Sequence, residues 1–72
     1  RKDDIPLLIN HFLEQICHEQ GWKTKSFSAE AMRALQQRSW PGNIRELRNV
    51  VERLIILSGD VITEQDVQLF GM

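Results

Sequence analysis

Arg45 is the residue best placed to do chemistry, because it follows a turn sequence, Pro41-Gly42-Asn43, that is typical of a helix start. A helix N-terminus carries about half a positive charge, so an exposed cation there loses about 0.3–1 kcal/mol. Two interpretations stay open. Either Arg45 is solvated, with its stem over Trp40 and its charge partly offset by Glu46, or it forms an anion site with the free amides and the dipole of the helix start.

The turn itself has a definite expected geometry. Pro41 fixes its own φ near about −65° and favours an extended Trp40, so a preceding helix must end before them. Pro-Gly suits the two central positions of a type II turn, because Gly42 can adopt a positive φ. Asn43 can then cap the next helix by accepting hydrogen bonds from its free amides. We expect that helix to run from Ile44 to about Ser58.

Two motifs, in this order, give the chain a resemblance to a known family. The first is the opening sequence Arg1-Lys2-Asp3-Asp4-Ile5-Pro6-Leu7-Leu8. The second is Trp40-Pro41-Gly42-Asn43-Ile44-Arg45-Glu46-Leu47, followed by Asn49, Glu52, Arg53 and Leu54. Together they resemble the helical lid subdomain of the AAA+ ATPase domain in NtrC-type activators of sigma-54 RNA polymerase, which are bacterial enhancer-binding proteins. The resemblance covers most of the chain and is weaker in the middle loop and at the C-terminal end.

The resemblance implies an all-α fold, a small four-helix lid that closes over a nucleotide held by an adjoining α/β subdomain. In this family a lid arginine, the sensor II residue, approaches the terminal phosphates of ATP, and Arg45 occupies the matching position. The nucleotide-binding residues implied here are Arg45, Asn43, Ile44 and Ile5, of which Ile5 would contact the adenine ring. No catalytic residue and no metal ligand is implied for residues 1–72.

The parent protein implied by the resemblance is an ATP-dependent transcriptional activator. The sequence holds no Gly-x-x-x-x-Gly-Lys-Ser/Thr phosphate loop and no acidic metal-binding motif, which by resemblance lie upstream. We therefore expect ATP and Mg to bind the parent, while the 72 residues alone neither hydrolyse ATP nor bind it tightly. The implied partners are the upstream AAA+ α/β subdomain, further copies in a homo-oligomeric ring, and, through other domains, sigma-54 RNA polymerase and enhancer DNA.

Length and composition fit one small domain. A chain of 72 residues buries only about 60% of its unfolded surface, so its stability should depend on a partner surface. Nine basic and ten acidic residues give a net charge of −1, which argues against a surface devoted to nucleic acid. One cysteine, Cys17, and no run of membrane-spanning length fit a cytoplasmic location. Because the sequence begins at Arg1, we expect residues 1–72 to be a piece of a longer protein.

Apolar spacing and capping residues predict the other helices. The first should run from Ile5 to Gln20, capped by Asp3 or Asp4 and closed by Gly21. The second should follow a Ser28 cap for about ten residues. The last should run from Glu64 to Phe70 after a Thr63–Asp66 capping box and a brief extended pair, Val61 and Ile62.

The remaining side chains carry weaker expectations. In the connection between the first two helices, Trp22 and Phe27 should fold back onto the helices while Lys23 and Lys25 stay solvated. The unbroken apolar run Leu54–Leu57 should be buried all round or cover a partner. His11, Cys17 and His18 lack the paired spacing of structural zinc sites, so we expect no metal there.

Two alternative functions belong to other classes. A helix-turn-helix DNA-binding module would turn Arg45, Arg48 and Arg53 toward DNA, but Glu46 and Glu52 lie among them. A helical protein-interaction domain without a nucleotide role would use the Leu54–Leu57 run as its partner surface. Steep salt dependence of DNA binding would support the first alternative.

Overall fold

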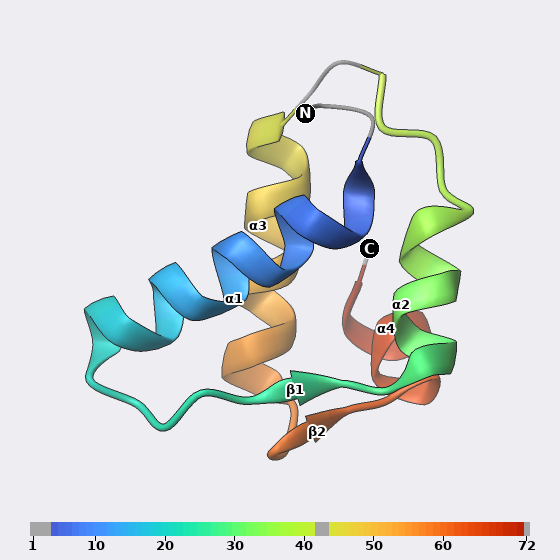
Figure 1. The fold of residues 1–72 in the computed structure, drawn as a ribbon. Coiled ribbons are helices and arrows are strands. Elements are labelled where there is room, and N and C mark those ends of the chain that lie inside the picture. Colours follow the sequence, from blue (N-terminus) through green and yellow to red (C-terminus); the bar gives the residue numbers. More distant parts are fainter. Residues whose placement is uncertain (1–3, 42–43, 72) are drawn as a thin grey trace.

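The computed structural model describes residues 4–41 and 44–71. In this part of the chain the elements are α1 (Ile5–Gln20), β1 (Ser26–Phe27), α2 (Ala29–Gln36), α3 (Ile44–Leu57), β2 (Val61–Ile62) and α4 (Glu64–Phe70). Figure 1 shows α1 crossing α3 while α2 lies beside α4, and these are the helix pairs in closest contact. The prediction of a small all-α, four-helix domain is therefore confirmed. The radius of gyration, 11.0 Å, matches the ~11 Å expected of a compact domain of this length.

Helix α1 has the bounds that its local signals predict. The Asp4 carboxylate accepts a hydrogen bond from the Leu7 amide at 3.3 Å, and Pro6 lies in the first turn, where its missing N–H costs nothing. Gly21 ends the helix with a left-handed φ of 70°, and its amide donates to the last carbonyls of the helix. A residue without a Cβ is favoured there.

Helices α2 and α3 are slightly shorter than predicted. Ser28 caps α2 as expected, its hydroxyl accepting from the Ala31 amide at 3.0 Å, but α2 has eight residues rather than about ten. Helix α3 ends at Leu57, one residue before the predicted Ser58. The predicted turn at Gly42 and the Asn43 cap lie outside the described residues.

Helix α4 also has its predicted bounds. The Asp66 amide donates to the Thr63 hydroxyl at 3.2 Å, while the Thr63 amide donates to the Asp66 carboxylate at 2.9 Å. This reciprocal pair is the expected capping box, with Asp in the place of the usual Glu or Gln. Ile62 and Val67, on either side of it, are both buried.

A parallel pairing of β1 with β2 joins the α1–α2 connection to the α3–α4 connection. Ser26 is in register with Val61 and Phe27 with Ile62, and the flanking amides of Ser26 and Ser28 donate to the carbonyls of Asp60 and Ile62. The sequence indicated that Val61 and Ile62 are extended but gave no partner for them. The pairing places the connection before α2 beside the connection before α4 (Figure 1).

One hydrophobic core is shared by all these elements. Its buried members come from α1, α2, α3, β2 and α4: Ile9, Phe12, Leu13, Ile16, Cys17, Ala31, Leu35, Leu47, Val50, Val51, Leu54, Ile55, Ile62 and Val67. A fully buried aliphatic side chain of this kind contributes about 1.5–3 kcal/mol. Among the residues described, no helix combines the length and apolar character needed to cross a bilayer.

The sequence predicts that the apolar run at the end of α3 is either buried all round or covers a partner, and the structure excludes the first alternative. Leu54 and Ile55 are buried, but Ile56 and Leu57 are 56% and 52% exposed. Four consecutive residues of a helix point in directions about 100° apart, so a helix lying on one core can bury only part of such a run. The run is therefore not buried all round within this chain.

Candidate functional site

The connection between α2 and α3 is anchored by Trp40. Its indole N–H donates to the Leu35 carbonyl at 2.9 Å, and its half-buried ring packs against the core. The carbonyl belongs to the end of α2, where backbone acceptors lack partners within the helix. Trp40 thereby holds the connection against the domain five residues before Arg45.

Arg45 is the second residue of α3 and is exposed. Among residues 4–41 and 44–71, its guanidinium has no hydrogen-bond, ion-pair or ring partner. A cation in the first turn opposes the helix dipole, so the charge of Arg45 costs free energy at this position. Glu46, in the same turn, offsets part of the cost through the dipole, but no described residue pairs with the Arg45 guanidinium. The arrangement suits an anion that approaches from outside.

Two half-buried isoleucines lie at the same end of the molecule. Ile5 is the first residue of α1 and Ile44 the first residue of α3, and both pack against the core while leaving part of their surface accessible. In Figure 1 the first turns of α1 and α3 both lie at the upper end of the view. The predicted residues Ile5, Ile44 and Arg45 thus supply accessible apolar surface and a cation at one end of the domain. Asn43, the fourth, lies outside the described residues.

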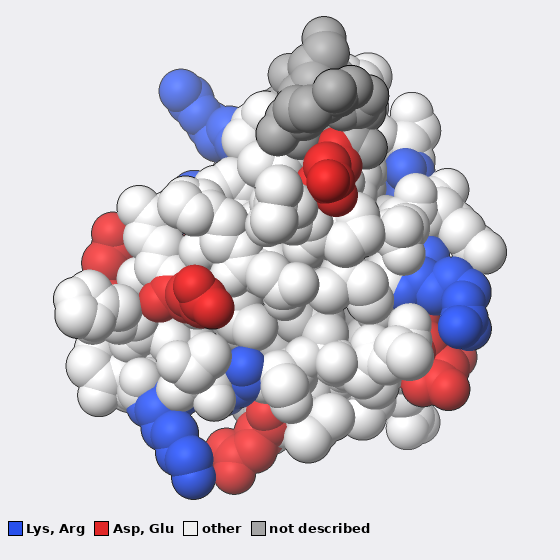
Figure 2. Space-filling model, viewed as in Figure 1, with Lys and Arg blue, Asp and Glu red and all other residues white. Residues whose placement is uncertain are grey.

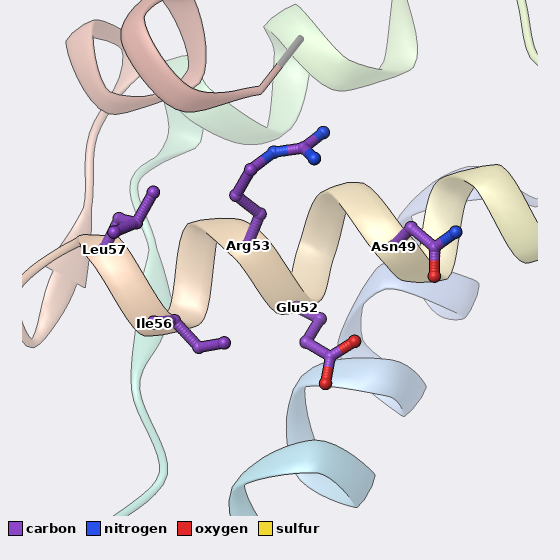
Figure 3. A pocket seen from close by; sticks show the side chains of 5 residues that line it. All are labelled: Asn49, Glu52, Arg53, Ile56 and Leu57. Atoms are coloured by element: carbon purple, nitrogen blue, oxygen red, sulfur yellow. The ribbon is translucent and has the colours of Figure 1, made fainter.

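A shallow hollow of about 410 Å³ lies further along α3 and contains none of these predicted residues. It is lined by Asn49, Glu52, Arg53, Ile56 and Leu57. Figure 3 shows Arg53 directed toward the end of α4 and Glu52 toward α1. The hollow is an open surface on one helix, so we do not regard it as the nucleotide site.

The arginines of α3 do not form a basic stripe. Arg48 pairs with Glu19 of α1 at 3.4 Å and with Glu52 at 3.7 Å, the second being the predicted i,i+4 pair. Arg53 donates to a backbone carbonyl of α4. On the face drawn in Figure 2, acidic and basic side chains are interspersed. Because Arg48 and Arg53 are bonded within the domain, α3 offers few cations to the phosphates of DNA.

Metal binding finds no support in the described part of the chain. Cys17 is buried in the core, whereas His11 and His18 are exposed. No group of three or more His, Cys, Asp or Glu residues is placed there to hold an ion.

Comparison with known proteins decides the family. The model of the AAA+ ATPase lid domain matches residues 1–69. The chain belongs to this family. The match covers both motifs, all of α1, α2 and α3, and α4 as far as Leu69, so the lid assignment applies to nearly the whole domain.

The relatives of this lid domain are regulatory proteins. It is 53% identical over 58 residues to the putative response regulator NtrX-like of Rickettsia typhi, covering 81% of the chain and 12% of that relative. It is 44% identical over 70 residues to the transcriptional regulatory protein ZraR of Escherichia coli, covering 96% of the chain and 16% of that relative. The lid domain therefore spans less than a fifth of the length of either.

A solved structure shares the fold. NtrX from Brucella abortus, crystallised in complex with ADP, superposes with a TM-score of 0.77 and 45% sequence identity. The match covers 92% of this lid domain and 16% of the NtrX chain. At 45% identity, the two proteins resemble each other in sequence as well as in fold.

Sequence reasoning missed three cations of the lid domain that donate to backbone carbonyls distant in the chain. The Lys25 ammonium donates to the carbonyls of Ile55 and, at 2.8 Å, of Ser58, at the end of α3. The expectation that Lys25 is solvated is wrong, because helix-end carbonyls attract a cation. Its neighbour Trp22 is 42% exposed, contrary to expectation, with the ammonium 5.9 Å from its ring centre. Phe27 packs partly buried against the core, as expected.

The other two missed cations are Arg38 and Arg53, which reach the end of α4. No local pattern identifies these roles, since the acceptor carbonyls lie 17 to 33 residues away in the chain. The sequence offers only a weak signal for such a role, namely a basic residue shortly after a predicted helix, as at Arg38.

Proposed function

We propose that this lid domain senses nucleotide in an ATP-dependent activator of sigma-54 RNA polymerase, with Arg45 as its sensor II arginine. Family membership supplies the lid, and the ADP in the related NtrX structure supports a nucleotide in the parent protein. The observation that carries the assignment is the exposed guanidinium of Arg45 at a helix start, which has no partner in the part of the chain that the structure describes. A phosphate arriving there would offset the unfavourable charge and bring a bidentate acceptor to the guanidinium.

The proposal divides the work within the parent protein. The upstream α/β subdomain would hold ATP and Mg, while Arg45 stabilises negative charge on the terminal phosphate and loses that contact after hydrolysis. Ile5 and Ile44 would offer apolar surface to the nucleotide, and Asn43 would be a further nucleotide-binding residue. The 72 residues alone would not be catalytic. Ring assembly, sigma-54 RNA polymerase, enhancer DNA and a bacterial cytoplasmic location belong to the parent in this proposal.

The test replaces Arg45 in the full-length protein. We expect Arg45→Ala to lower ATP turnover by about 10²-fold or more, as removal of a single charge-stabilising donor does. Arg45→Lys should recover little, because an ammonium cannot form the paired hydrogen bonds of a guanidinium. Arg33→Ala, which removes an exposed arginine from α2, is the matched control. Unchanged ATP affinity, turnover and transcription activation in Arg45→Ala would refute the assignment.

A further inference from the structure

Arginines from two directions hold the C-terminal turn of α4. Arg38, which follows α2, donates to the carbonyls of Gly71 and, at 3.4 Å, of Val67. Arg53 of α3 donates through its Nε to the carbonyl of Phe70 at 2.8 Å. The last carbonyls of a helix lack partners within it and carry partial negative charge, so two guanidiniums are well placed there. We call these two side chains and their acceptors the arginine clamp.

Gly71 shows how closely the clamp fits. It is buried, and its amide donates to the Val67 carbonyl at 2.9 Å. A Cβ at this position would lie 2.6 Å from the Val67 oxygen and 3.2 Å from the Arg38 guanidinium. The backbone must therefore shift if any other residue replaces Gly71. The path of the chain leaving α4 is set by this contact.

Both arms of the clamp begin on elements next to Arg45. Arg53 lies eight residues after it on the same helix, about 12 Å along the axis at 1.5 Å per residue. Arg38 precedes the connection that Trp40 anchors to the Leu35 carbonyl. Packing of α3 and α2 against α4 supports the same arrangement. A displacement of α3 at its first turn therefore reaches the last turn of α4 through directly bonded groups.

We propose that the arginine clamp makes α3 and the exit of the chain from α4 one mechanical unit, so that nucleotide-driven movement at Arg45 redirects the chain beyond Gly71. This inference rests on the proposed function, since nucleotide is what would move α3. It assigns Arg38 and Arg53 as positioning residues that connect the nucleotide state to the part of the parent protein after the lid.

Amide hydrogen exchange in the full-length protein tests the inference. Exchange is followed at the first turn of α3 and at Gly71, without nucleotide and with a non-hydrolysable ATP analogue. In the unaltered protein we expect nucleotide to change the exchange rate at both places, at Gly71 by on the order of fivefold or more. In Arg53→Gln the response at α3 should persist while the response at Gly71 falls below about twofold. Arg33→Gln should behave as the unaltered protein.

The comparison of responses separates coupling from simple stabilisation. A purely structural clamp would let Arg53→Gln speed exchange at Gly71 equally with and without nucleotide, keeping the response intact, and this result would overturn the inference. Gly71→Ala keeps both guanidiniums but displaces the backbone, so it should lose the response as well. If α3 responds in the unaltered protein and Gly71 does not, the inference alone is wrong. If α3 does not respond either, the proposed function is wrong too.

Discussion

Replacing Lys25 by Met should weaken the attachment of the α1–α2 connection to the end of α3. The ammonium donates to the carbonyls of Ile55 and Ser58, which have no acceptor role left in the helix once α3 ends. Methionine keeps an unbranched apolar side chain of similar length, so the substitution removes the charge and its hydrogen bonds while largely retaining packing. Unfolding should become easier because two carbonyls lose their partner at once.

The size of the effect follows from these contacts. A hydrogen bond from a charged donor contributes about 1.5–3 kcal/mol net, and partial exposure of Lys25 places each bond near the lower end. We expect a loss of about 2–3 kcal/mol. The whole chain should have about 4–11 kcal/mol of stability, so the loss is a large fraction of it. The corresponding fall in melting temperature is about 8–24 °C.

Thermal and urea unfolding followed by circular dichroism would measure the loss in the 72-residue chain. Lys23→Met is the matched control, because Lys23 is exposed in the same connection and has no hydrogen-bond partner among the described residues. It should change stability by no more than about 0.5 kcal/mol. Equal melting temperatures for the two variants would show that the Lys25 contacts contribute nothing, and the reasoning would fail.

Two further substitutions test single groups by the same unfolding measurements. Ser58→Ala should raise stability by about 1 kcal/mol, because the Ser58 hydroxyl is buried without a hydrogen-bond partner in the described part of the chain. A loss of stability in this variant would mean that the hydroxyl does form a hydrogen bond. Gly21→Ala should lower stability by about 1–2 kcal/mol, since its φ of 70° strains any residue with a Cβ although the space around it is open. Gly59→Ala, at an equally open position without a positive φ, should be nearly neutral, and similar losses in both would contradict the explanation.

The helices could be predicted because their signals are local. Asp4, Gly21 and the Thr63–Asp66 pair each act within four residues of the helix end that they determine, so the bounds of α1 and α4 followed from the sequence. The ends of α2 and α3 were less certain, because no glycine cap marks them.

Non-local contacts could not be predicted. The pairing of Ser26 with Val61 and the partners of Lys25 depend on which distant segments the fold brings together. No local sequence pattern indicates which segments these are. Arg45 differs from both. The family position and the helix start predicted an unusual cation, and the structure leaves it exposed, while its phosphate contact stays a prediction because that partner is not part of the chain.

The short strand pair also affects the order of folding. Ser26 and Val61 lie 35 residues apart in the chain, and the main helix contacts, α1 with α3 and α2 with α4, also join elements that are not neighbours in sequence. Helices form in about a microsecond, but closing a long loop carries an entropic cost before any contact repays it. Because the strand pair joins only two residues on each side, we expect β1 to meet β2 after the larger helix contacts have formed. A pairing of only two residues on each side would then be among the last native contacts to form and the first to open on unfolding.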